Sequence, residues 1–279
     1  MISQSENKLI YIANNDGLLE YNGAKWSLYP SPNNAIIRSV KVVGNIVYTG
    51  SFMEFGFWKK NMYGILKYKS LTSTFENEML ENEQIWNIIE VDNWIIFQSS
   101  NRIYMFDYKS GLTKLIESKY KINRLFRVDN EIYFDNSNAS LFKLQEGKEF
   151  LFIKNEFLKT HTILNIFNNK EGLLFLTKKN GFYQYKNNVF TEWKPQLNRF
   201  LKMKVVYSSI LLKDKSFILG TISNGIFHIS PKGEVMFHLN HSNGLSNNTI
   251  LSLFLDVDKN VWLGLDNGIN IVNMDKNSK

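Results

Sequence analysis

Short apolar runs separated by polar turns recur in the same order along the whole chain. The clearest copy covers residues 248–272, with an apolar run, a polar turn, a second run ending near Gly264, a tight turn and a third run. Residues 206–229 repeat this order, and Gly220 stands where the first copy has Gly264. Apolar runs of this length between Gly, Asn, Asp and Lys predict β-strands rather than helices.

Weaker copies precede these two, and a fourth apolar run follows most of them. Four short antiparallel strands form a blade of a β-propeller, in which neighbouring blades bury both faces of each sheet. We therefore predict an all-β protein, a seven-bladed β-propeller with four-stranded antiparallel blades in a single domain over residues 1–279. The predicted blades span residues 1–30, 36–71, 84–116, 122–153, 161–193, 203–239 and 248–274.

The two ends of the chain predict how the first and last blades are built. Met1–Gln4 aligns with an innermost strand, so the first blade is expected to be complete. The last repeat supplies three strands, and Asp275–Lys279 are polar and too few for a fourth, so we expect an incomplete last blade and a longer parent protein. The alternative is that Met1–Gln4 forms the outer strand of the last blade. Helical signals are weak; the best candidate, Glu76–Gln84, is expected to be a loop.

Three segments resemble a known repeat. Asn243–Asn270 resembles the regulator-propeller repeat of bacterial hybrid two-component sensors and of related regulators with a triple-tyrosine domain. Gly17–Pro30 resembles the first blade of the triple-tyrosine regulators, and Ile37–Val40 and Tyr48–Trp58 resemble their second blade. The resemblance implies a periplasmic sensor domain for signal transduction and transcription regulation, followed in the parent protein by a triple-tyrosine domain, a membrane span and a kinase or helix-turn-helix output. It carries over no catalytic residue.

The amino-acid composition excludes several kinds of site and of binding partner. The chain has no cysteine, which excludes disulfides, Cys-bearing zinc sites and thiol nucleophiles. The formal charge is +7, but the lysines stand singly at turns, so we expect no nucleic-acid partner. No run reaches the roughly 18 apolar residues of a membrane span, and no signal peptide opens the chain. The expected partners are a ligand and the downstream domains of the same protein.

No motif for metal binding or catalysis is recognisable. Asp256–Asn260 resembles the start of a calcium loop, but Val261 and Asn267 stand where such a loop needs Gly and Glu, so we expect a turn. The histidines lack metal-ligand spacing, and His228 and His238 are expected to form at most a polar pair. We therefore predict no metal, no cofactor and no enzymatic activity. A propeller enzyme acting on a polysaccharide, as a lyase or hydrolase, is the alternative, and a protein-interaction scaffold is a third reading.

One position in the first strand of successive repeats offers side chains suited to a ligand. Leu164 and Leu251 occupy it in two repeats. In the other repeats the position holds large polar or aromatic residues, namely Arg38, Trp86, Arg124 and Tyr207. Aromatic faces stack on sugars, and guanidinium groups donate paired hydrogen bonds to acidic groups. We predict that these four residues bind a small molecule or an oligosaccharide; the alternative is that they only fill the centre of the propeller.

Overall fold

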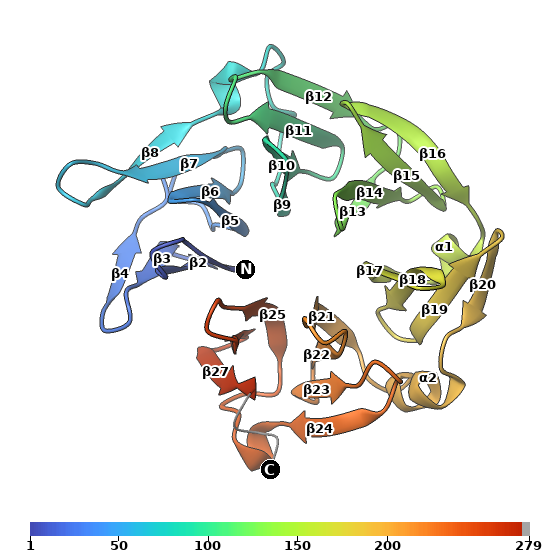
Figure 1. The fold of residues 1–279 in the computed structure, drawn as a ribbon. Coiled ribbons are helices and arrows are strands. Elements are labelled where there is room, and N and C mark those ends of the chain that lie inside the picture. Colours follow the sequence, from blue (N-terminus) through green and yellow to red (C-terminus); the bar gives the residue numbers. More distant parts are fainter. Residues whose placement is uncertain (275–279) are drawn as a thin grey trace. The chain divides into compact units, whose positions relative to one another are not determined.

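The computed structural model describes residues 1–274, which divide into two compact units. The first unit is Met1–Lys154 and the second begins at Asn155. Each unit is a series of antiparallel sheets whose strands are hydrogen-bonded in chain order (Figure 1). Six sheets have four strands and the last has three, which confirms the predicted seven-bladed β-propeller fold. The single domain stays a prediction, because the chain divides into two compact units.

The first unit contains four blades, with the first strand of each on the inner side of the series and the fourth on the outer side (Figure 1). Its strands are β1 (Ile2–Gln4), β2 (Ile10–Asn14), β3 (Gly17–Tyr21) and β4 (Trp26–Tyr29) in blade 1, β5 (Ser39–Val43), β6 (Ile46–Gly50), β7 (Phe55–Lys60) and β8 (Leu66–Ser70) in blade 2, β9 (Asn87–Val91), β10 (Trp94–Gln98), β11 (Arg102–Asp107) and β12 (Thr113–Glu117) in blade 3, and β13 (Ile122–Val128), β14 (Glu131–Asn136), β15 (Ser140–Gln145) and β16 (Lys148–Lys154) in blade 4.

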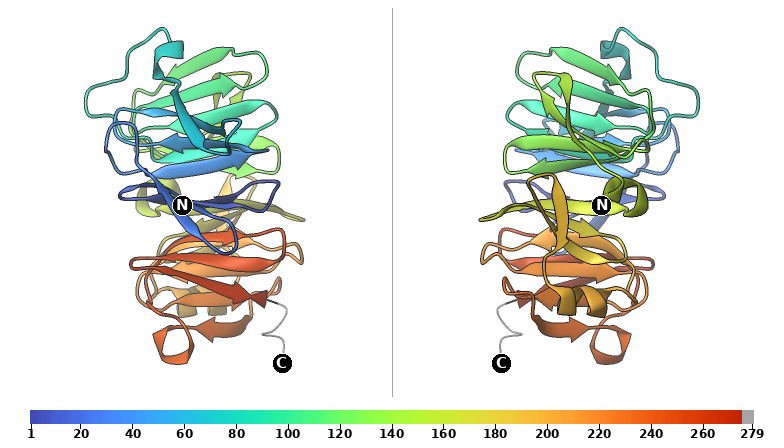
Figure 2. Two further views of the ribbon diagram at one scale, coloured as in Figure 1. Left: turned by 90° about the vertical axis from the view of Figure 1, so that its left-hand side faces the viewer. Right: turned by 90° about the vertical axis from the view of Figure 1, so that its right-hand side faces the viewer.

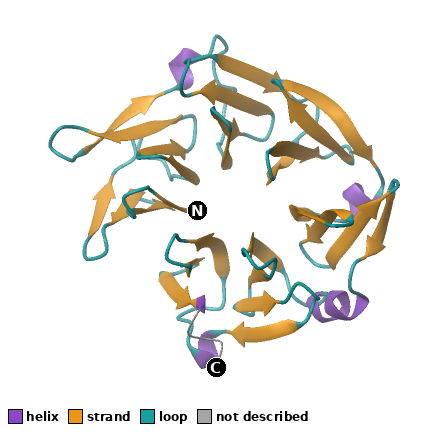
Figure 3. Ribbon diagram, in the orientation of Figure 1, coloured by secondary structure: helices purple, strands orange, loops and turns teal. Residues whose placement is uncertain are grey.

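The second unit contains the last three blades, and strands dominate it as they do the first (Figure 3). Its strands are β17 (Ile163–Asn169), β18 (Gly172–Thr177), β19 (Gly181–Lys186) and β20 (Val189–Glu192) in blade 5, β21 (Val206–Leu211), β22 (Phe217–Thr221), β23 (Ile226–Ile229) and β24 (Val235–Leu239) in blade 6, and β25 (Ile250–Leu255), β26 (Asn260–Leu265) and β27 (Ile269–Asn273) in blade 7. The helices are α1 (Phe157–Thr160), α2 (Pro195–Leu201) and two 3₁₀ turns, η1 (Thr72–Thr74) and η2 (His241–Asn243).

The core lies between neighbouring sheets, which explains the unbroken apolar runs in the sequence. In β10, Ile95, Ile96 and Phe97 are all fully buried. Ile95 and Phe97 belong to the apolar cluster shared with blade 2, whereas Ile96 points to the other face and joins the cluster shared with blade 4. Because both faces of a blade are covered, its middle strands need no alternating polar face.

Blades 2 and 3 meet so closely at Gly50 that no side chain fits there. A Cβ atom on this glycine would lie 2.3 Å from Cγ2 of Ile85, at the start of blade 3, and 2.7 Å from Oγ of Ser39. The Ser39 hydroxyl donates a hydrogen bond of 3.1 Å to the Ile85 carbonyl. We call this contact of a serine, a glycine and an isoleucine the Ser-Gly-Ile lock.

The same lock recurs between blades 6 and 7. A Cβ atom on Gly220 would lie 2.6 Å from Cγ2 of Ile250, and the Ser208 hydroxyl donates a hydrogen bond of 3.3 Å to the Ile250 carbonyl. The glycine that marks the repeat in the sequence therefore has a physical role, since it allows adjacent blades to approach closely.

The ends of the chain confirm the predicted strand order. β1 pairs with β2, with Ile2 opposite Ile12 and Gln4 opposite Ile10, so the first blade is complete. The alternative pairing of Met1–Gln4 with the last blade is wrong. Blade 7 has three strands, and within residues 1–274 no strand pairs with the outer side of β27. Asp275–Lys279, expected to be too few for an outer strand, lie outside the described residues.

The two α-helices were not predicted from the sequence. Glu76–Gln84 is a loop, as expected. α2 follows β20 on the outer side of the second unit (Figure 2). Pro195 is its first residue, and proline at this position is the one sequence signal that was available. The helix carries Asn198, whose side-chain Oδ1 accepts a hydrogen bond of 2.7 Å from the Phe182 amide and whose Nδ2 donates one of 2.9 Å to the Phe182 carbonyl. Asn198 thus supplies an acceptor for the Phe182 N–H, and it shares the Phe182 carbonyl with the Trp193 N–H, which donates to it at 3.0 Å.

Candidate functional site

The predicted ligand-binding position lies where the first strand of a blade begins, and it is marked by a β-bulge. The register shifts by one residue there in the last four blades, and the residues left out of the ladder are Asn123, Leu164, Tyr207 and Leu251. In blades 2 and 3, Arg38 and Trp86 occupy the equivalent place just before β5 and β9, and their amides donate to Gly50 and Gln98. A bulged residue is outside the ladder, so its side chain can be aimed away from the sheet.

The strand register of blade 4 shows that one predicted ligand-binding residue, Arg124, was assigned to the wrong position. Arg124 pairs with Asp135, as Ser39 pairs with Gly50 in blade 2, so Arg124 lies one residue beyond the column and Asn123 occupies the column position. The repeat comparison missed this because a bulge adds a residue without changing the apolar pattern.

The structure brings Arg38 and Trp86 together. The guanidinium carbon of Arg38 lies 5.6 Å from the centroid of the Trp86 ring, within the range of a cation–π contact. Trp86 is 47% exposed, and Arg38 is also exposed. Within residues 1–274 the Arg38 side chain forms no ion pair, so its N–H donors are available to a ligand. This pair is the most ligand-like part of the predicted site.

In blade 4, which follows the blade of Trp86, a buried carboxylate stabilises the β-bulge. Asp135 is 3% exposed, accepts a hydrogen bond of 3.0 Å from the Asn123 amide group and accepts another of 3.0 Å from the Arg124 backbone N–H. Burial raises the pKa of Asp135 to about 6, against the opposing effect of these hydrogen bonds. The geometry of the bulge is therefore maintained by a group that is costly to ionise.

We expect Asp135→Asn to change how stability depends on pH. Because the pKa is raised in the folded state, the contribution of Asp135 is most favourable below pH 4 and is lost as pH rises from about 4 to 6. The variant should therefore gain stability relative to the wild type over that interval, by roughly 2–3 kcal/mol in total. Urea unfolding at pH 4, 5, 6 and 7 measures the difference; a difference that stays constant with pH would contradict the burial argument.

Tyr207 lies in the second unit. It is the bulged residue of β21 and is 39% exposed. The Nζ atom of Lys178, which follows β18, lies 5.9 Å from the centroid of its ring. Each unit therefore presents one exposed aromatic ring with a cation near it at this strand position.

One set of Asp, Ser and His side chains comes together in blade 6, in an arrangement unlike a catalytic triad. The Ser216 hydroxyl donates a hydrogen bond of 2.6 Å to Asp214, and His228 Nε2 lies 2.8 Å from the same hydroxyl oxygen. A nucleophilic serine needs a histidine between itself and the carboxylate and access to substrate. Ser216 stands between the other two and is fully buried, so the set fixes a turn. His228 and His238 do not pair: His228 lies opposite Phe237, and His238 stacks on Phe227.

Within the described residues, no group of three or more His, Asp or Glu side chains is placed to hold a metal ion. Asp256–Asn260 is a turn, as expected: Asp256 accepts hydrogen bonds from the Asn260 backbone N–H, from the Asn260 amide group and from Trp262 Nε1. None of the helices in residues 1–274 has the length and hydrophobicity needed to cross a bilayer.

No family model matches the chain, and no curated protein matches it in sequence. Among solved structures, it is similar to the extracellular domain of the putative hybrid two-component system BT4673 from B. thetaiotaomicron, with 18% identity and a TM-score of 0.72, covering 97% of this chain and 37% of that chain. The extracellular domain of the putative hybrid two-component system BT3049 from the same organism gives 17% identity and a TM-score of 0.69, covering 97% and 39%. The WD40 β-propeller domain of Doa1 gives 10% identity and a TM-score of 0.70, covering 97% and 90%.

These similarities show the propeller fold, and the first two agree with the resemblance seen in the sequence. The chain spans 37% and 39% of the length of the two bacterial sensor chains.

Proposed function

We propose that this chain is a non-enzymatic, ligand-sensing propeller from the extracytoplasmic part of a bacterial signal-transduction regulator. The observation that supports this is the similarity in fold to two extracellular domains of hybrid two-component systems. The sequence resemblance to the regulator-propeller repeat is independent of that similarity. In this proposal the downstream domains of the same protein carry the output, including control of transcription.

The proposed ligand is a carbohydrate, and the proposed contact is the Arg38–Trp86 pair. A half-exposed indole offers an apolar face on which a sugar ring stacks, and a guanidinium group donates hydrogen bonds to hydroxyl or acidic groups beside it. Arg124, also in the first unit, and Tyr207, in the second, stay predicted ligand-binding residues, and Asn123 is added because the register places it in the column.

We expect Trp86→Ala to weaken binding of a responsive oligosaccharide by about 1–3 kcal/mol, the usual cost of losing an aromatic anchor. Isothermal titration of the purified chain against a panel of neutral and acidic oligosaccharides measures this. Trp26→Ala is the matched control, since Trp26 is 41% exposed but stacks on Tyr21 in blade 1. If both substitutions have the same effect, or if no oligosaccharide binds, the site proposal is wrong.

A polysaccharide lyase or hydrolase is the alternative function. The same panel tests it, because an enzyme would convert an oligosaccharide into shorter products during incubation. Product formation that is lost on heating the protein would replace the sensor proposal; intact oligosaccharide with measurable binding supports it. A pure interaction scaffold would bind none of the panel.

A further inference from the structure

The hairpin formed by β7 and β8 extends from the outer side of blade 2 and ends in an apolar tip (Figure 1). Met62, Tyr63 and Ile65 at this tip are 88%, 78% and 49% exposed. The corresponding turns of blades 1 and 4, residues 22–25 and 146–147, carry no large apolar side chain. A blade therefore does not need an apolar tip, and neighbouring exposed apolar side chains of this kind mark an interaction site.

Asn61 fixes the backbone of the tip. Its Oδ1 accepts hydrogen bonds of 3.0 Å from the N–H groups of Tyr63 and Ile65, and its own N–H donates one of 2.9 Å to the Ile65 carbonyl. Gly64 completes the turn with a φ of 74°, which glycine adopts without strain. The apolar side chains are thus held in place before any partner arrives, which lowers the entropic cost of binding.

The hairpin behind the tip is positively charged. Residues 55–71 contain neither Asp nor Glu but four lysines, namely Lys59, Lys60, Lys67 and Lys69. Lys60 is paired with Glu20 at 2.9 Å, whereas the other three are exposed and form no ion pair with any residue in the described part of the chain. Lys59 lies directly opposite Lys67, and like charges at opposite positions destabilise a strand pair. An anionic partner would remove that repulsion.

Acidic residues on the neighbouring turns do not cancel this charge. The β1–β2 turn of blade 1 lies at the same end of the sheets, since the Glu6 N–H donates to the Gly44 carbonyl in blade 2. The turns of blades 1 and 3 at this end hold three acidic and three basic residues, namely Glu6, Asp92, Asp107, Lys8, Lys25 and Lys109. They balance one another, so the hairpin keeps its positive charge.

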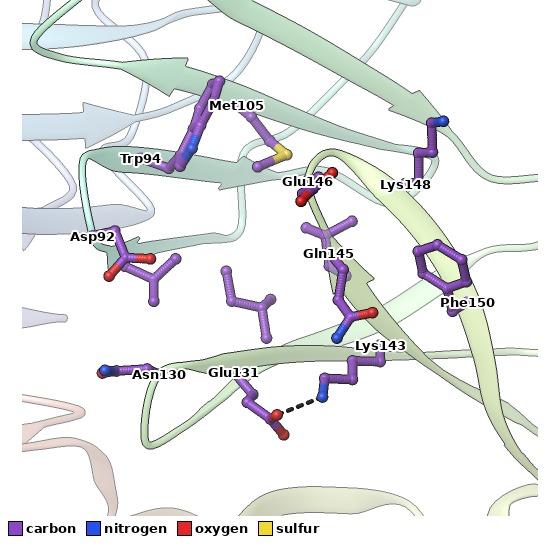
Figure 4. A pocket seen from close by; sticks show the side chains of 13 residues that line it. Asp92, Trp94, Met105, Asn130, Glu131, Lys143, Gln145, Glu146, Lys148 and Phe150 are labelled. Carbon is purple, nitrogen blue, oxygen red and sulfur yellow. Dashed lines mark hydrogen bonds and ion pairs between the residues drawn. The ribbon is translucent and has the colours of Figure 1, made fainter.

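A cleft of about 680 Å³ between blades 3 and 4, also in the first unit, has no such excess of charge (Figure 4). Asp92 and Glu146 at its rim are balanced by Lys148 and by Lys114, which donates a hydrogen bond of 2.7 Å to the Glu146 carbonyl. Charge therefore selects no occupant at the cleft, whereas it selects an anionic partner at the hairpin.

We propose that the tip of the β7–β8 hairpin inserts into the surface of an anionic lipid bilayer. Side chains as exposed as Met62 and Tyr63 cannot enclose a small ligand, so the partner must be one that they can enter. A bilayer offers negative headgroups for the lysines and apolar chains beneath for the tip, and tyrosine favours the boundary between these layers. A protein would need an apolar cavity ringed by acidic groups to match. This surface goes beyond the proposed sensing function and does not rest on it.

The first test is co-sedimentation of the full chain with vesicles, made either of equal parts phosphatidylglycerol and phosphatidylcholine or of phosphatidylcholine alone. We expect binding to the anionic vesicles only. Lys59→Gln with Lys67→Gln should weaken it by about tenfold or more, because each lysine near such a surface contributes roughly fivefold. Lys119→Gln with Lys121→Gln is the matched control, since it removes the same charge from exposed side chains at the opposite end of the blades and should cost less than about twofold.

The second test measures insertion of the tip itself. Because the chain has no cysteine, Tyr63→Cys can be labelled with nitrobenzoxadiazole at that position alone. Its emission should increase and shift to the blue with anionic vesicles. The same label on Ser137→Cys, in the exposed turn between β14 and β15 at the opposite end of the blades, should not change.

Three results would overturn the proposal: equal behaviour with neutral and anionic vesicles, equal losses in the two lysine pairs, or an unchanged spectrum of the label at Tyr63→Cys. Absence of binding to both kinds of vesicle would reject a bilayer and favour a protein as the partner of the tip. Trp86→Ala separates this proposal from the sensing function, because it should leave vesicle binding unchanged while it weakens oligosaccharide binding. Circular dichroism of each variant confirms that the blades are intact.

Discussion

Asn198→Asp is expected to destabilise the second unit by about 3–5 kcal/mol, the usual cost of leaving a buried charge without a partner. The wild-type side chain is 4% exposed and both accepts from and donates to the backbone of Phe182. Aspartate keeps the acceptor but turns the donor into a second oxygen that faces the Phe182 carbonyl. The repulsion and the lost hydrogen bond act together in a site that water does not reach.

Urea unfolding followed by tryptophan fluorescence measures this loss. Asn187→Asp is the control, because Asn187 is exposed on the turn after β19, and a surface change of this kind costs within about 0.5 kcal/mol. A similar stability for the two variants would mean that α2 is not held to β19 by the Asn198 side chain. A smaller loss for Asn198→Asp at pH 3 than at pH 7 would show that the charge is responsible.

Gly50→Ala is expected to cost about 2–3 kcal/mol, at the upper end of what overpacking a core typically costs. The added Cβ atom would overlap Cγ2 of Ile85 at 2.3 Å and Oγ of Ser39 at 2.7 Å, so blade 3 has to move away from blade 2. Gly111→Asn is the control, since no heavy atom lies within 4 Å of the position a Cβ would take and asparagine tolerates its φ of 77°.

The double variant Gly50→Ala with Ile85→Ala tests whether the Ser-Gly-Ile lock is responsible. Removing Cγ2 of Ile85 relieves the worst overlap, so the double variant should be more stable than the sum of the two single losses predicts. Additive losses would mean that the glycine is needed for another reason.

The fold was predictable because the apolar runs repeat, and the lock explains part of that repetition. Gly220 and Gly264 align in the sequence, and at Gly220 the structure shows a close approach of two blades. What the sequence could not show is the register. Arg124 was assigned to a column that Asn123 occupies, because a bulge shifts the pairing by one residue and leaves the spacing of apolar residues unchanged.

Of the candidate site, the contact between Arg38 and Trp86 was predictable, since both stand at the same place in adjacent repeats. The cleft between blades 3 and 4 was not. Val91 and Leu144, which line it, belong to the apolar cluster between the two blades, so the sequence shows them only as core residues. α2 was missed because a helix of seven residues is too short to show a period.

The three-stranded blade has a consequence for what can pair with its outer edge. β27 reads Ile-Asn-Ile-Val-Asn, with neither a charge nor a proline to discourage a neighbour, and Ile271 is 51% exposed. Within residues 1–274 no strand pairs with the outer side of β27, and an open strand edge is a template on which a further strand can continue the sheet. A fourth strand from outside these residues would complete the blade by hydrogen bonding to β27. The edge of β27 is therefore the place where this blade accepts a strand that the described residues do not supply.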